Sequence, residues 1–167
     1  MIAVLALCHG NICRSPLAEV LLEAAVAAAP DLAGRVTVTS AGTSGEHEGE
    51  GMHAESAALL RARGLRTAHR ARRLTPEIAA GQALILAADR HNLRAAERLL
   101  GTLAPETAPA LRLLRDFDAH AAGGDLDDPW GHPRSAYVRA AREIEAAIPG
   151  ILDELRSLLA ARAAREG

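Results

Sequence analysis

The sequence predicts an α/β fold with a parallel sheet, in a single domain that spans residues 1–167. Short apolar runs that suit buried strands alternate along the chain with segments whose apolar residues recur at helical spacing. Strands that alternate with helices form βαβ units, which place the strands in parallel and cover the sheet with helices. The 167 residues are 49% hydrophobic, which is enough for one core and excludes a largely disordered chain.

The first strand and the first helix are the clearest elements. The apolar run Ile2–Leu7 suits a strand that is buried on both faces. A helix is predicted to follow, with Ser15 as its N-cap, Pro16 in its first position and Pro30 closing it. The spacing of its apolar residues predicts one buried face formed by Leu17, Val20, Leu21, Ala24, Ala25 and Ala28.

The later elements continue the alternation. Further strands are predicted at the β-branched or aliphatic runs Arg35–Ser40, Ala83–Ala88 and, as a candidate fourth strand, Ala110–Leu114. Further helices are predicted over residues 54–63, which Gly64 ends, over Asn92–Leu100, and from Ser135 onward with Pro149-Gly150 as a candidate interruption. Residues 116–134, rich in Asp, Gly and Pro, are predicted to form a long loop.

Composition excludes several classes of protein. All 19 basic residues are arginine, and the net charge of −2 gives no sign of a nucleic-acid or anionic-membrane binder. Aromatic residues make up only 2%, too few for base-stacking platforms, and no apolar run approaches the length of a membrane span. The two cysteines cannot form a disulfide framework or a four-ligand zinc site. We expect a cytoplasmic protein with reduced thiols and with neither metal nor cofactor.

The candidate site is the polar segment Cys8–Ser15, called the anion loop below. It connects a strand to a helix N-terminus, where unpaired N–H groups and the helix dipole favour an anion. Gly10 allows the backbone amides to turn inward, and the Arg14 guanidinium matches two oxygens of a phosphate. These surroundings favour the thiolate of Cys8, which is the nucleophilic form. The combination suits attack on phosphorus.

A buried cysteine at a strand end is more often a packing residue, so this alternative has to be weighed. The position of the loop at a strand–helix junction, together with Gly10, Asn11, Ser15 and Pro16, favours the functional interpretation. The loop is not a Walker P-loop, because the spacing differs and the lysine is missing.

Hydrolysis of a phosphate monoester also needs a proton donor for the leaving oxygen and later a base for water. Five carboxylates of the predicted loop compete for this role: Asp116, Asp118, Asp125, Asp127 and Asp128. Asp128 is favoured because Pro129 restricts it to an extended conformation. A solvated acidic turn formed by Asp125, Asp127 and Asp128 is the alternative.

The segment Cys8–Glu19, CHGNICRSPLAE, resembles the signature loop of the low-molecular-weight protein tyrosine phosphatases. The resemblance extends over nearly the whole chain: supporting segments are Ser40-Ala41-Gly42-Thr43, His69-Arg70-Ala71-Arg72, Ala88-Asp89-Arg90 and Asp128-Pro129. It implies a three-layer fold, with a four-stranded parallel sheet flanked by helices in the phosphotyrosine phosphatase I-like (flavodoxin-like) architecture.

The resemblance also implies an activity and roles for particular residues. The activity is metal-independent hydrolysis of protein phosphotyrosine through a phosphocysteine intermediate, by a monomer that releases inorganic phosphate. Cys8 is implied as nucleophile, Arg14 as phosphate ligand, Asp128 as general acid, and Trp130 as an aromatic wall for the substrate. The remaining phosphate-binding residues are implied to be His9, Gly10, Asn11, Ile12, Cys13 and Ser15. Ser40 is implied to brace Asn11, and Cys13 to form a reversible disulfide with Cys8.

Two departures from the family pattern bear on specificity. Glu46 stands where many members carry an aromatic residue, and it would place negative charge at the substrate wall, so a basic flanking sequence is expected in the substrate. Ile12 stands where the protein-arginine phosphatases of this scaffold carry threonine, which favours an aromatic phosphoester.

Three other functions are candidates for a loop of this kind. A protein-arginine phosphatase and a non-catalytic phosphoprotein-binding module are the alternatives, although a binding module would be expected to lose the nucleophile or the acid. A thiol-dependent arsenate reductase is excluded because residues 14–167 hold no cysteine for its relay.

An arginine-rich segment is either a solvated face or a docking surface for an acidic partner; its members are Arg61, Arg63, Arg66, Arg70, Arg72 and Arg73.

Overall fold

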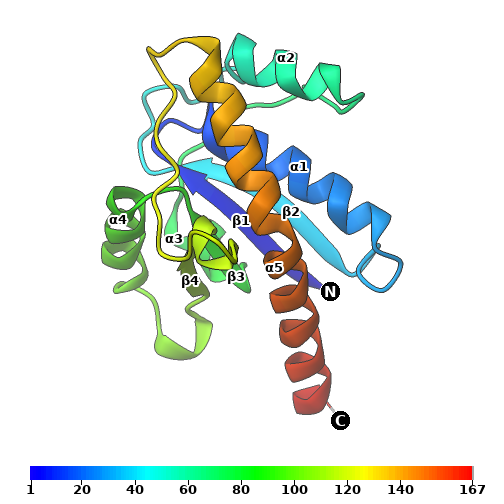
Figure 1. The fold of residues 1–167 in the computed structure, drawn as a ribbon. Coiled ribbons are helices and arrows are strands. Elements are labelled where there is room, and N and C mark those ends of the chain that lie inside the picture. Colours follow the sequence, from blue (N-terminus) through cyan, green and yellow to red (C-terminus); the bar gives the residue numbers. More distant parts are fainter. Residues whose placement is uncertain (167) are drawn as a thin grey trace.

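The computed structural model describes residues 1–166, and over these residues it has one four-stranded parallel sheet between two layers of helices (Figure 1). The elements in chain order are β1 (Ile2–Cys8), α1 (Arg14–Ala28), β2 (Val36–Gly42), α2 (Ala54–Ala62), α3 (Pro76–Ala80), β3 (Leu84–Ala87), α4 (Arg90–Leu100), β4 (Ala110–Leu113) and α5 (Arg134–Glu166). Short 3₁₀ turns lie at Pro105–Thr107 and Leu114–Phe117. The predicted fold class, including the candidate fourth strand, is confirmed.

The order of the strands fixes where a ligand can bind. The sheet runs β2-β1-β3-β4, and all its pairs are parallel. From β1 the chain moves first to one neighbour and then to the other, so the end of β1 is a topological switch point. Ligands of open α/β sheets bind beyond the carboxyl ends of the strands at such a point. The anion loop follows β1 directly, and in Figure 1 the cyan loop after β2 and the yellow segment before α5 approach the same end of the sheet.

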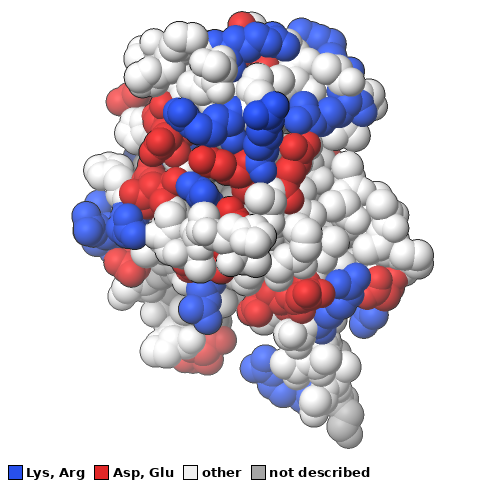
Figure 2. Space-filling view, viewed as in Figure 1, with Lys and Arg blue, Asp and Glu red and all other residues white. Residues whose placement is uncertain are grey.

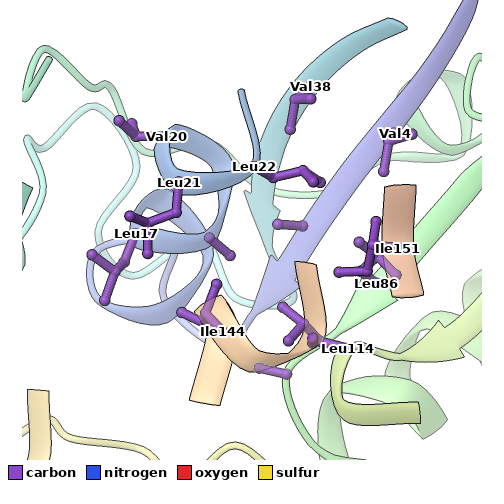
Figure 3. Packing of buried hydrophobic residues seen from close by; sticks show 14 of the residues in the cluster. Val4, Leu17, Val20, Leu21, Leu22, Val38, Leu86, Leu114, Ile144 and Ile151 are labelled. Carbon is purple, nitrogen blue, oxygen red and sulfur yellow. The ribbon is translucent and has the colours of Figure 1, made fainter. Parts of the chain in front are cut away.

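The central strand β1 supplies side chains to both helix layers. Val4 and Ala6 belong to the larger cluster of buried residues, with side chains of α1 and α5 such as Leu22 and Ile151 (Figure 3). Leu5 alternates to the other face and packs in the smaller cluster that includes residues of α3 and α4. Each fully buried aliphatic side chain contributes about 1.5–3 kcal/mol, so burial on both faces makes β1 a rigid support for the loop that follows it.

The start of α1 differs from the prediction. The helix begins at Arg14, Cys13 occupies the cap position, and no side chain caps the helix. The prediction that Ser15 is the N-cap is wrong, because the Ser15 hydroxyl contacts groups within the anion loop instead. The buried face is also shifted: Ala28 is exposed, and Leu22 and Val26 are buried in its place.

The other differences concern element ends and short turns. β2 continues to Gly42, two residues beyond the predicted strand, because Gly42 pairs with Cys8 in the register of β1 and β2. The short helix α3 was not predicted, although Thr75 before Pro76 is a capping signal and its side chain accepts from the amide of Ile78.

The candidate interruption of the last helix is not observed. α5 runs continuously from Arg134 to Glu166 with Pro149 inside it. Its apolar residues pack on the sheet, and the absence of a side chain at Gly150 lets the helix approach Phe117, whose carbonyl oxygen a β-carbon there would overlap. Packing therefore outweighs the local cost of proline. Despite its 33 residues, α5 is not apolar enough to cross a membrane, and neither is any other helix within residues 1–166.

Candidate active site

The anion loop surrounds the thiol of Cys8 at the end of β1. Cys8 and Arg14 are each only 2% exposed, and the Cys8 Sγ lies 3.0 Å from the Ser15 Oγ. A cavity of about 230 Å³ opens above the thiol, and it is lined by Cys8, His9, Gly10, Ile12, Cys13, Arg14, Glu46, His47, Asp128 and Trp130. Predicted site residues from three separate segments thus meet at one cavity. No group of three or more His, Cys, Asp or Glu side chains within residues 1–166 is arranged to hold a metal ion.

Asn11 organises the interior of the anion loop. It has a φ of 56°, a left-handed conformation that asparagine tolerates better than most residues. Its side-chain nitrogen donates to the Ser15 Oγ at 2.8 Å and to the Ser40 Oγ at 2.9 Å, and its Oδ1 accepts from the amide of Arg72 at 2.9 Å. The ring of His69 lies 2.7 Å from its carbonyl oxygen. The predicted contact between Ser40 and Asn11 is therefore present.

The contacts of Ser40 continue outward to the surface. Its hydroxyl donates to the carboxylate of Glu19, which accepts in turn from Arg66 at 2.6 Å. Because the Ser40 proton is committed to Glu19, the Ser40 oxygen is left to accept from Asn11. Because each group in this series has a fixed role as donor or acceptor, the hydrogen bonds favour one orientation of the Asn11 side chain.

Two glycines permit the close packing of the loop. A β-carbon on Gly42 would lie 2.6 Å from the carbonyl oxygen of His9, so no other residue fits there without backbone movement. A β-carbon on Gly10 would lie 2.9 Å from the ring of His47, which borders the cavity. Glycine is therefore required by sterics at position 42, whereas a side chain at position 10 would displace the His47 ring.

Arg14 is oriented by groups from two distant segments. One guanidinium nitrogen, Nη1, donates to Asp89 Oδ2 and to the carbonyl oxygen of Leu126, both at 2.7 Å. The other, Nη2, lies 3.5 Å from the Asp128 carboxylate. Burial by itself would lower the pKa of Arg14, but Cys8 and the two carboxylates outweigh it and raise the pKa above its ordinary value. The guanidinium is a fixed positive charge beside the thiol.

The carboxylates considered as proton donors have different surroundings. Asp128 borders the cavity and is about half exposed, and its Oδ1 accepts from the amide of Trp130 at 3.2 Å. Asp125 contacts Arg90, away from the cavity lining, and the Asp127 side chain makes no hydrogen bond or ion pair within the described part of the chain. Trp130 is 60% exposed and borders the cavity. Of these three neighbouring acids, Asp128 is the one that borders the cavity.

The cavity is also bordered by the titratable side chains of His9, Glu46 and His47, and Glu50 pairs with the last of them. The His9 Nε2 lies 3.7 Å from Glu46, and the His47 Nδ1 lies 3.0 Å from Glu50. All four side chains keep some exposure to solvent. The position of Glu46 at the cavity agrees with the prediction, whereas His47 was not predicted as a site residue.

Cys13, which also borders the cavity, is 4% exposed. Its Sγ lies 3.8 Å from the hydroxyl of Tyr137 in α5, and the Tyr137 ring stacks on that of His53 with centroids 4.9 Å apart. Burial raises the pKa of the Cys13 thiol from 9.0 to about 12, and burial likewise raises the pKa of Tyr137. Cys13 is therefore a neutral thiol at physiological pH and a much weaker nucleophile than a thiolate.

The arginine-rich segment does not form one continuous basic surface. Arg66 pairs with Glu19 and Glu23, Arg72 donates to the carbonyl of Ser40, and Arg63 pairs with Glu145. Figure 2 shows basic side chains over α2 and the first turns of α5, with acidic ones directly beside them. Half of the six arginines thus serve internal contacts.

Sequence reasoning missed several residues that support the site. Asp89 orients Arg14, His69 contacts the carbonyl of Asn11, and Tyr137 contacts Cys13. The segments that contain Asp89 and His69 resemble family segments, which was a usable signal. For Tyr137, a single tyrosine in an amphipathic helix, there was none.

The Cys8 thiol lies beside the buried Arg14 guanidinium and the Asp128 carboxylate, and its loop ends at a helix N-terminus. This arrangement can bind a tetrahedral oxyanion and attack its central atom. Comparison with known proteins agrees with this chemistry. Residues 3–161 match the family described as low molecular weight phosphotyrosine protein phosphatase, and the chain belongs to this family.

Named relatives match over most of their length. The chain is 40% identical to a low molecular weight protein-tyrosine-phosphatase of Streptomyces coelicolor, with 94% of this chain and 95% of that protein covered. It is 32% identical to a protein-arginine-phosphatase of Geobacillus stearothermophilus, over 92% and 96% of the two chains. Among solved structures, a Drosophila arginine phosphatase superimposes with a TM-score of 0.84 at 26% identity, covering 93% of this chain and 98% of that one.

Proposed function

We propose that this phosphatase hydrolyses phosphotyrosine in proteins through a phosphocysteine intermediate. The observation that supports this most directly is the meeting of the Cys8 thiol, the Arg14 guanidinium and the Asp128 carboxylate at one cavity. Trp130 and the aliphatic side chain of Ile12 border the same cavity and offer apolar surface to a phenyl ring.

The reaction proceeds in two displacements at phosphorus. The Cys8 thiolate attacks in line, an S–P bond forms, and the bond to the phenolic oxygen breaks while Asp128 donates a proton to that oxygen. Arg14 and the loop amides hold the equatorial oxygens. Water then attacks phosphorus, Asp128 accepts a proton from it, the S–P bond breaks, and phosphate leaves with the thiolate restored.

The mouth of the cavity supports a preference for basic residues beside the phosphotyrosine. Glu46 borders the cavity, where its charge opposes a dianionic substrate unless a flanking cation compensates. Basic flanking residues are therefore expected to lower KM, and the Glu46→Gln variant is expected to lose this preference. Steady-state kinetics on matched peptides with basic and acidic flanks would measure it, and equal ratios in the two proteins would contradict it.

The second candidate is hydrolysis of phosphoarginine in proteins, which is favoured by the relative from Geobacillus and by the Drosophila structure. Kinetics on paired phosphotyrosine and phosphoarginine substrates separate the two candidates. We expect kcat/KM to be higher for phosphotyrosine, because the cavity wall at Ile12 is apolar. A higher value for phosphoarginine would reverse the assignment.

Arg14→Lys is expected to lower kcat/KM by about 10²-fold or more. A lysine keeps the charge but cannot hold Asp89 and the Leu126 carbonyl while presenting two further N–H groups to phosphate. Initial rates over a range of substrate concentrations measure the effect. Activity near that of the wild type would show that charge alone suffices at this position.

We also propose that Cys13 protects the nucleophile by forming a reversible disulfide with Cys8 in a cytoplasmic, thiol-reducing setting. Peroxide converts the Cys8 thiolate to a sulfenic acid, the Cys13 thiol attacks that sulfur, an S–S bond forms, and water leaves. The raised pKa of Cys13 leaves Cys8 as the first site of oxidation.

The Cys13→Ser variant is therefore expected to recover less activity than wild type when a thiol reductant is added after peroxide. Residual activity after timed peroxide exposure and reduction is the measurement, and intact mass would show the loss of two hydrogens in oxidised wild type. Equal recovery in both proteins would assign Cys13 a packing role only.

A further inference from the structure

The residues that precede and begin α4 contact both the phosphate-binding side of the site and the segment that carries the proposed acid. The Asp89 carboxylate holds Arg14, and the next residue, Arg90, holds Asp125. Asp89 and Arg90, which are adjacent in sequence, thus hold two parts of the site. Asp89 holds the Arg14 guanidinium, and Arg90 holds Asp125, which lies three positions before Asp128.

Asp125 is bound at three points. Its Oδ1 accepts from the backbone amide of Arg90 at 3.0 Å, and its Oδ2 lies 3.3 Å from the Arg90 Nη1. Its carbonyl oxygen accepts from Arg115 Nη1 at 3.1 Å. The amide of Arg90 is one of the N–H groups that a helix leaves unpaired. Asp89 is the N-cap of α4 and accepts from the amide of Asn92, and Asp125 supplies a further acceptor to the same helix start from a distant segment.

The chain between Asp125 and Asp128 is tied down through its backbone. The buried Leu126 donates its amide to the carbonyl of Ala88 at 2.8 Å and offers its own carbonyl to Arg14. The side chain of the next residue, Asp127, makes no hydrogen bond or ion pair within residues 1–166. The course of this short segment therefore depends on how Asp125 and Leu126 are held.

We propose that Asp125 is a positioning residue for the proposed acid Asp128, acting through its contact with the first turn of α4. The inference rests on the general-acid role proposed for Asp128. The charge pair alone would contribute little, because the Arg90 and Asp125 side chains are 54% and 37% exposed. The hydrogen bond from the Arg90 amide to the Asp125 carboxylate is the contact that orients Asp125, because it attaches the carboxylate to the start of α4.

Asp125→Ala is expected to lower kcat for a phosphotyrosine peptide by about 10- to 100-fold, because a misplacement of about 1 Å in a reacting group can cost ~10²-fold. Hydrolysis of an aryl phosphate with a strongly acidic nitrophenol should change far less, since that leaving group needs no proton. Inhibition by inorganic phosphate should also be retained, because Asp89 still holds Arg14. A general loss of structure would lower both rates and weaken phosphate inhibition together.

Matched variants make the test specific. Asp127→Asn alters a neighbouring acid whose side chain has no hydrogen bond or ion pair with the described residues, and Arg94→Ala removes an arginine one turn further along α4. Both variants are expected to behave as wild type. Arg90→Ala keeps the backbone amide that binds Asp125 but removes the guanidinium contacts to Asp125 and to the carbonyl oxygen of Gly123, so we expect a smaller loss of the same leaving-group dependence. The double variant Arg90→Ala with Asp125→Ala should lose less than the two single variants together, because the two side chains share one contact.

The outcomes separate this inference from the proposed function. If Asp128→Asn shows a leaving-group-dependent loss and Asp125→Ala does not, the positioning role of Asp125 is overturned and the acid role of Asp128 stands. If Asp128→Asn shows no such loss, the acid assignment itself fails. Asp125→Asn is the substitute variant if Asp125→Ala fails to fold. It keeps an acceptor for the Arg90 amide and is expected to give an intermediate loss. Wild-type behaviour in both Asp125→Asn and Arg90→Ala would contradict the proposal.

Discussion

Cys8→Ser is expected to remove phosphatase turnover, by about 10⁴-fold or more, while inorganic phosphate and vanadate still bind. The serine hydroxyl stays protonated at neutral pH, so the S–P bond of the proposed intermediate has no counterpart. The oxyanion cradle remains, because Arg14 is held by Asp89 and the Leu126 carbonyl, and Asn11 by Ser40 and Arg72, none of which depends on the thiol.

Rapid-quench kinetics and calorimetric titration with phosphate would measure the two parts of this expectation. Cys13→Ser is the matched control, because it removes the other thiol of the same loop, whose pKa of about 12 keeps it from acting as a thiolate. Substantial turnover in Cys8→Ser, or its loss in Cys13→Ser instead, would contradict the covalent mechanism. Loss of phosphate binding together with turnover would show that the thiol also supports the loop.

The local sequence pattern was sufficient to predict the fold class and the position of the anion loop. The strand that ends at Cys8 could be predicted because it is buried on both faces and therefore apolar throughout. The anion loop could be predicted because all of its chemistry lies within eight consecutive residues that connect a strand and a helix. Parallel pairing followed from the alternation of strands and helices.

Contacts between distant segments could not be predicted in the same way. Arg14 meets Asp89 across 75 residues, and Cys13 meets Tyr137 across 124. Such pairs depend on how the helices dock on the sheet, which periodicity does not encode. The incorrect cap assignment has a related cause, because the hydroxyl of Ser15 satisfies the capping pattern locally but contacts Cys8 and Asn11 in the folded loop.

The choice of proton donor shows where local reasoning and packing must combine. Pro129 favoured Asp128 over its neighbours but could not place any of the carboxylates. In the structure Asp125 binds Arg90, Asp127 makes no side-chain hydrogen bond or ion pair within residues 1–166, and Asp128 borders the cavity 3.5 Å from the Arg14 guanidinium. The three acids thus differ in surroundings more than in chemistry.

Asp128→Asn is expected to lower phosphotyrosine hydrolysis by about 10²- to 10⁴-fold, the usual contribution of general acid catalysis. The loss should be far smaller for an aryl phosphate whose phenol is strongly acidic, because a stable phenolate departs without a proton. The dependence of kcat on pH should also change on its acidic side, because the carboxylate that must be ionised to accept a proton from water is gone. Asp127→Asn is the control and should affect neither substrate by more than a few fold. If Asp127→Asn gives the leaving-group-dependent loss and Asp128→Asn does not, the proton comes from the preceding residue, and neither the restriction by Pro129 nor the proximity of Asp128 to Arg14 identifies the acid.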